Sequence, residues 1–105
     1  MRLALPFVLL VLAAAPGRAQ TAAPHSYVPP HGFVPDSATA VRIAVAVWIP
    51  IYGEQQIMSE QPFVARLKGG AWTVSGTLPP NSVGGTAVAK IAKRDGRILF
   101  VIHYQ

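Results

Sequence analysis

The chain has 105 residues, of which 51% are hydrophobic and 12% charged, with no cysteine and a formal net charge of +5. This length allows one small domain with a tail, and nothing larger. The lack of cysteine excludes disulfides, thiol chemistry and lipoprotein-type lipidation, and the modest charge argues against the dense positive surface that nucleic-acid binding needs, so we expect no nucleic-acid partner.

Residues 1–19 have the layout of a cleaved secretory signal peptide. Arg2 gives a basic start, an apolar stretch runs from Leu3 to Ala15, and small residues stand at Gly17 and Ala19. The apolar stretch is well short of the roughly 20 residues that a membrane-spanning helix needs. Cleavage after Ala19 removes two arginines and lowers the net charge to +3. We therefore expect an exported protein, periplasmic or secreted, with no stable membrane anchor after cleavage.

Residues 20–35 form a proline-rich leader between the signal and the domain. Four prolines and one glycine fall within it, and such a segment sustains neither a helix nor a central strand. We expect an extended conformation, with Tyr27, Val28 and Phe33 pinning its end onto the α+β domain, residues 36–105.

A helix is predicted to begin after Asp36, because its carboxylate is a good N-cap for the first free amides. Apolar residues then repeat at helical spacing along one stripe: Ala40, Ile43, Ala44, Val47 and Ile51. The opposite face, which includes Trp48, is largely apolar too, so the helix is either wrapped by other elements or leaves a face that hints at a homodimer. Pro50 predicts a kink or an end, and Gly53 is the expected terminal residue.

After a polar connector, residues 54–61, the hydrophobic period changes to two, which is typical of strands. Residues 63–68 alternate in polarity, and the glycine pair at 69–70 is a turn signal. Further strands are predicted over residues 71–77, 85–92 and 97–104. The predicted fold class is therefore α+β, with an N-terminal helix packed on a four-stranded antiparallel meander.

The chain is poor in carboxylates that could do catalytic work. Asp36 is assigned to the helix cap and Asp95 to a turn, which leaves Glu54 and Glu60 on the connector. We interpret these two as solvated loop residues, because exposed charges usually have no further role and a carboxylate pair needs rigid placement.

The three histidines, His25, His31 and His103, lack the spacing that aims metal ligands from one helix. Nucleophile-elbow and phosphate-loop motifs are missing as well. The sequence thus predicts a non-enzyme with no catalytic residues, no metal and no cofactor. An enzymatic role stays open only if Glu54, Glu60 or a histidine converge in the fold.

Three aromatic residues are the candidate partner-binding residues: Trp48, Tyr52 and Trp72. The simpler interpretation is core packing, because tryptophans in small domains mostly fill volume. The alternative is that they anchor a partner, since tryptophan and tyrosine are enriched at interface hot spots.

A series of short motifs runs along residues 28–104, among them WIPIYG at 48–53, PFVARL at 62–67, GTLP at 76–79 and GGTA at 84–87. The series resembles the small immunity-protein domain with a nuclear-transport-factor-two-like fold that occurs in bacterial polymorphic toxin systems. The resemblance implies a truncated roll of that type, or a cystatin-like one. It further implies that the domain neutralises a cognate toxin by binding it, and it brings no catalytic residues.

The leading hypothesis is therefore a non-catalytic exported binding protein that occludes a toxin acting in the periplasm or envelope. Two alternatives stay open. One is a periplasmic small-molecule or peptidoglycan-fragment binding module that uses an apolar cavity between helix and sheet. The other is a cystatin-like enzyme inhibitor that presents the loop at residues 79–81 to its target.

Overall fold

The computed structural model describes residues 25–105, so the expected signal peptide and the start of the leader lie outside the described residues. Two helices come first, α1 (Ser37–Tyr52) and α2 (Glu54–Met58). Four strands follow: β1 (Val64–Lys68), β2 (Ala71–Ser75), β3 (Ala87–Ala92) and β4 (Ile98–His103). Within the described part, no helix is both long and apolar enough to cross a membrane.

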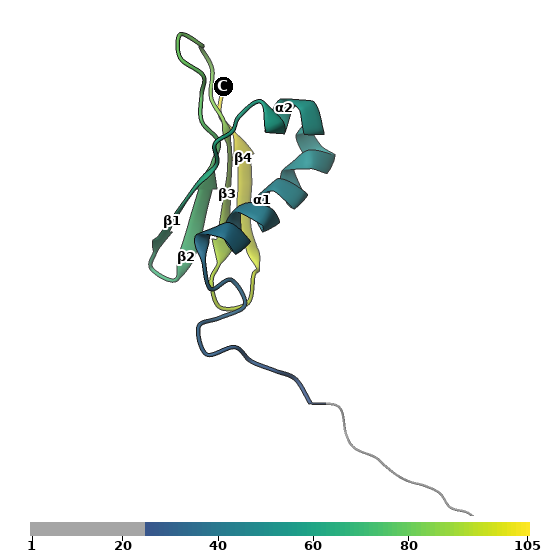
Figure 1. Ribbon diagram of the computed structural model, residues 1–105, viewed down its shortest axis with the longest axis vertical. Coiled ribbons are helices and arrows are strands. Elements are labelled where there is room, and N and C mark those ends of the chain that lie inside the picture. The colour runs from purple at the N-terminus through teal and green to yellow at the C-terminus, as the bar shows by residue number, and fades with distance from the viewer. Residues whose placement is uncertain (1–24) are drawn as a thin grey trace, which may run out of the picture.

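The strands form one antiparallel meander in the order β1-β2-β3-β4, and α1 runs diagonally across one of its faces (Figure 1). Trp72 on β2 pairs with Leu67 on β1 and with Ile91 on β3. A bulge between Lys90 and Ile91 shifts the register of β4. This arrangement confirms the predicted α+β class and the predicted order of helix and strands.

Helix α1 begins and ends where the capping signals indicate. The Asp36 carboxylate accepts hydrogen bonds from the Thr39 amide at 2.8 Å and the Thr39 hydroxyl at 2.7 Å. These bonds hold the pKa of Asp36 below its ordinary value. The helix continues through Pro50 and stops at Gly53, whose φ of 94° is a conformation that glycine adopts without a steric penalty.

The core lies between α1 and the sheet, and fewer residues of α1 are fully buried in it than the sequence predicts. Ala40, Ala44 and Trp48 are fully buried at every fourth position, whereas Ile51 is 57% exposed. Ala40 and Ala44 of the predicted stripe are therefore confirmed as core residues, whereas Ile51 was wrongly placed in the core and Trp48 wrongly placed on the outer face. Because Ala40 and Ala44 are small, α1 can pack close to the sheet at these positions. Trp48 is then the one large side chain of α1 that is fully buried. The remaining core residues come mainly from the sheet: Trp72, Val74, Ala87, Ala89 and Ile91.

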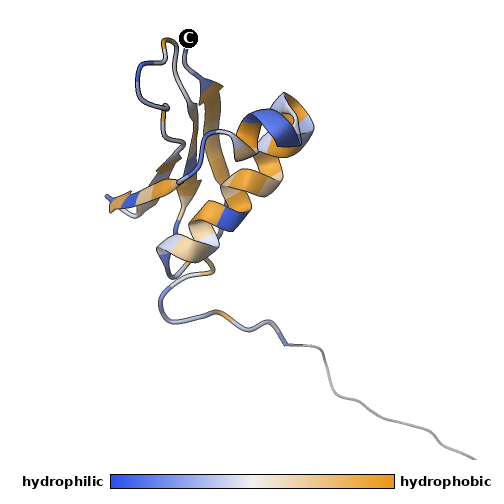
Figure 2. Cartoon of the chain, turned by 45° about the horizontal axis from the view of Figure 1, so that its top comes forward, coloured by the Kyte–Doolittle hydropathy of each residue, from blue (hydrophilic) through white to orange (hydrophobic). Residues whose placement is uncertain are grey.

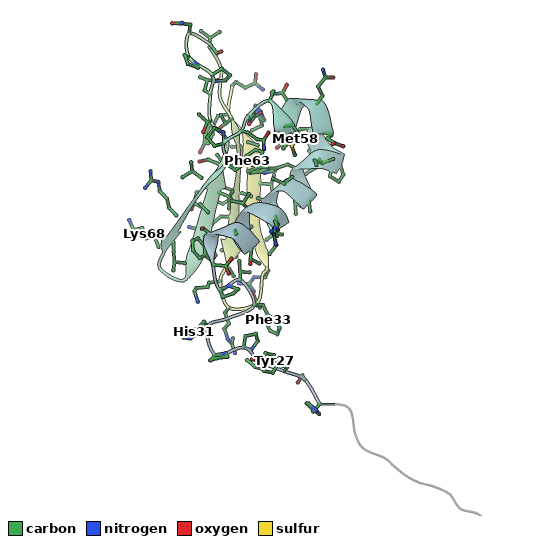
Figure 3. The ribbon with its side chains drawn as sticks, in the orientation of Figure 1. Tyr27, His31, Phe33, Met58, Phe63 and Lys68 are labelled. Carbon is green, nitrogen blue, oxygen red and sulfur yellow. The ribbon has the colours of Figure 1, made fainter. Side chains whose placement is uncertain are left out.

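The leader attaches to the domain through Val34. This residue is fully buried, and its carbonyl accepts a hydrogen bond from Trp72 Nε1 at 2.8 Å. Its amide donates to the Lys93 carbonyl at 3.0 Å. Tyr27, Val28 and Phe33 are more than half exposed, but the Phe33 amide donates to the Arg94 carbonyl at 3.0 Å. The sequence prediction thus placed the attachment and Phe33 correctly, and it missed the buried Val34. In Figure 3, Tyr27 and Phe33 lie beyond the end of the sheet, on the leader itself.

Candidate functional site

Glu60 follows α2 and is the only buried charged side chain among residues 25–105, with 3% of its surface exposed. Its Oε1 accepts a hydrogen bond from the Ala87 amide at 2.8 Å. Its Oε2 accepts from Gln56 Nε2 at 2.9 Å and from His103 Nε2 at 2.8 Å. One carboxylate thereby joins α2 to β3 and β4.

Gly76, just after β2, makes room for this carboxylate. A Cβ at position 76 would lie 2.7 Å from Glu60 Oε1 and 2.8 Å from Glu60 Cβ, closer than side-chain carbons approach other atoms. The next residue, Thr77, donates its amide to the Glu60 carbonyl at 2.7 Å. The end of β2 therefore packs directly against Glu60, and only glycine fits there without a shift.

The environment of Glu60 favours its charged form. Burial by itself raises the pKa of the carboxyl, but the hydrogen bonds from Ala87, Gln56 and His103 outweigh it and hold the pKa below the ordinary value of 4.5. The hydrogen bond to Glu60 in turn raises the pKa of His103 above 6.5, against the opposing effect of its own desolvation. When His103 is protonated, its imidazolium and the Glu60 carboxylate form an ion pair, with Nε2 2.8 Å from Oε2.

Both ring nitrogens of His103 are engaged. Nε2 faces the Glu60 carboxylate, and Nδ1 lies 2.8 Å from the carbonyl of Tyr104. With Glu60 ionised, both partners only accept, so both nitrogens must carry a proton. The imidazole ring of His103 also packs edge-on against the Tyr52 ring, and the centroids of the two rings are 5.1 Å apart. In its protonated form His103 has no lone pair with which to take a proton from a bound molecule, and the pair then acts as a tether between α2, β3 and β4.

The prediction that Glu60 is a solvated loop residue was wrong, because the connector contains helix α2 and returns the chain onto the sheet. Glu54, at the start of α2, is exposed as expected. The convergence that would keep an enzymatic role open does occur, between Glu60 and His103. A hollow of about 350 Å³ adjoins the pair, lined also by Leu78, Gly85 and Tyr104.

The three candidate aromatic residues do not share a surface. Trp48 is fully buried against Phe63, with ring centroids 5.7 Å apart, and its Nε1 has no hydrogen-bond partner in the described part of the chain. Trp72 is 8% exposed and bonded to Val34, while Tyr52 is half-buried beside His103. The two tryptophans fill the space between helix and sheet where the small-molecule alternative places its cavity. We therefore place no partner contact on them in the folded domain.

The other candidate groups stand apart from this pair. His25 and His31 lie exposed on the leader, and residues 25–105 contain no cluster of three or more potential metal ligands from histidine, aspartate and glutamate. The loop at residues 79–81 is exposed, with Asn81 at a φ of 62° and a turn closed by the Ser82 amide bonding to the Pro79 carbonyl.

Comparison with known proteins identifies a family for nearly the whole helix–sheet unit. The family described as NTF2 fold immunity protein, where NTF2 stands for nuclear transport factor two, matches residues 39–105. The match begins in the first turn of α1 and includes α2 and all four strands. Neither a protein with curated function nor a solved structure matches the chain. The chain belongs to the NTF2 fold immunity protein family.

Proposed function

We propose that this chain is an exported, non-catalytic immunity protein that neutralises a toxin protein by covering it in a stable complex. The observation that carries the proposal is the family match over residues 39–105. An immunity protein has a cognate toxin as its partner, and a domain of this size can offer the roughly 800 Å² that a standard interface takes from each side.

The hydrogen bonding of Glu60 and His103 supports a binding role over a catalytic one. A general base must have a free lone pair within reach of its substrate. When protonated, the His103 ring donates from both nitrogens, and the Glu60 carboxylate is only 3% exposed and accepts from Gln56, Ala87 and His103. The best-placed ionisable pair of the domain is thus used to hold α2, β3 and β4 together.

The layout of residues 1–19 supports export, and export determines where the toxin acts. A protein that leaves the cytoplasm protects only targets in the periplasm or envelope. The toxin proposed as partner is therefore one that attacks there, and the gene beside that of this chain is the first place to seek it.

The experiment is growth protection in a bacterial host that expresses the neighbouring toxin with a periplasmic signal. The full chain is co-expressed, and the matched control is the same chain without residues 1–19. We expect growth to recover with the full chain and to stay arrested with the control, because only the exported form meets the toxin. Arrest in both cultures would contradict the immunity role, and rescue by the control alone would contradict export.

A further inference from the structure

The sheet has a second face, opposite α1, that is covered by no other element of residues 25–105 (Figures 1 and 2). Neighbouring residues of a strand point to opposite faces of a sheet. Trp72 and Val74 point into the core, so the residues on either side of them in β2 lie on the uncovered face. The strand register aligns two rows across this face: Val64, Ser75, Val88 and Ile102, then Arg66, Thr73, Lys90 and Phe100. Val88, in the middle of the first row, is 9% exposed because its neighbours cover it. We call these two rows, together with Lys68 and Leu99, the open face.

The open face is positively charged and has no carboxylate to balance it. Arg66 and Lys90 stand in one row, two strands apart, and Lys68 extends from the end of β1 away from α1 (Figure 3). The four acidic residues of the chain all lie elsewhere: Asp36 caps α1, Glu54 begins α2, Glu60 is buried and Asp95 is in the turn before β4.

The open face also carries accessible apolar side chains. Val64, Leu99, Phe100 and Ile102 are each 40–45% exposed, three of them on β4. A hollow of about 460 Å³ on this face is lined by Lys68, Thr73, Lys90 and Leu99 among others, so basic and apolar side chains border it together. A contiguous exposed apolar patch bordered by polar and charged side chains is a feature of surfaces that bind other proteins.

We propose that the open face binds the toxin and fits a partner surface on which carboxylates surround exposed apolar side chains. This inference rests on the proposed function and adds to it the binding face and the chemistry of the partner. A second copy fits poorly, because two open faces would bring their arginines and lysines together. A nucleic acid uses the positive charge but leaves Val64 and Ile102 without apolar contacts.

The test is calorimetric titration of the neighbouring toxin with the exported chain and two charge-reversal variants. The first variant is Arg66→Glu/Lys90→Glu on the open face. The matched control is Arg42→Glu/Arg94→Glu, which changes the net charge equally at exposed positions on α1 and in the β3–β4 turn. Thermal unfolding checks the fold of each, and Arg66→Gln/Lys90→Gln replaces the first variant if that one unfolds.

We expect the open-face variant to weaken binding at least about tenfold and to reduce its salt dependence, and the control to change affinity less than about threefold. Toxin binding by the open-face variant at wild-type strength would overturn this inference and leave the proposed function intact. Failure of the unmodified chain to bind the toxin would overturn both. A stable dimer that buries the open face, or binding of poly-dT lost in the open-face variant, would assign the face to another occupant and overturn the inference.

Discussion

Glu60 and His103 are 43 residues apart in the chain and, with His103 protonated, form a partly buried ion pair, the one ion pair among residues 25–105. Their local sequence gives no sign of this, because a glutamate in a polar connector is exposed in most proteins. The three donors to Glu60 come from α2, β3 and β4, so the site exists only once these elements are packed. Gly76 was the one sequence feature that could have indicated a side chain packed closely against the end of β2. A glycine after a strand is, however, equally typical of an ordinary turn.

Replacement of Glu60 by glutamine should destabilise the domain by about 1–3 kcal/mol, because the amide cannot accept from all three donors and leaves a buried donor unpaired. The measurement is the free energy of unfolding in urea near pH 6. Glu54→Gln is the matched control, an exposed carboxylate on the same short helix, with an expected change within about 0.5 kcal/mol. Equal effects of the two substitutions would contradict the role assigned to Glu60.

The stability that this pair adds should depend on pH in both directions. The pKa of Glu60 is lowered from 4.5, so its contribution is complete above that pH and is lost as the pH falls through the folded value. The pKa of His103 is raised from 6.5, so its contribution is complete below that pH and is lost as the pH rises through the folded value. The difference in unfolding free energy between wild type and Glu60→Gln should be largest between pH 4.5 and 6.5. A difference that stays constant from acid to alkaline pH would exclude the pair as its source.

At the scale of elements, the parts of the fold that depend on local signals are those that the sequence predicts well. Asp36 and Gly53 mark the ends of α1, and alternating polarity marks the strands to within a few residues. Helix α2 was missed because five residues are too few to show a period and only Ile57 is buried. Ile51 and Trp48 of α1 were assigned to the wrong faces because the sheet decides which of two apolar helix faces is buried, and it packs against the side that carries Ala40 and Ala44.

The two tryptophans provide a matched test of how the leader is attached. Trp72→Phe removes the hydrogen bond to the Val34 carbonyl, whereas Trp48→Phe removes a ring of the same size whose Nε1 has no partner in the described structure. We expect amide exchange at Val34 to be about tenfold faster in Trp72→Phe, since the lost bond is worth about 1–2 kcal/mol. In Trp48→Phe, the exchange rate of the Val34 amide, measured relative to the amides of the core strands, should stay as in the wild type. The same exchange rate at Val34 in both variants would show that the indole bond does not hold the leader.

At the scale of the whole molecule, a small sheet carries one helix on one face and leaves the other face basic and apolar. The core is filled by Trp48 and Trp72, and the ionisable pair ties elements together, so what the domain presents to other molecules is surface. The sequence predicted this architecture and the immunity family. It could not locate the open face, because that requires knowing which side of the sheet α1 covers.

The central claim is that the chain acts by stoichiometric binding, and titration of toxin activity tests it most directly. The cognate toxin is held at a concentration well above the dissociation constant, and its residual activity is measured against added immunity protein after short and long incubations. We predict a linear decline to an end point at equal molar amounts, unchanged by incubation time, with active toxin recovered after denaturing separation. Loss of toxin activity at small molar fractions that deepens with time would show catalytic inactivation and contradict the account.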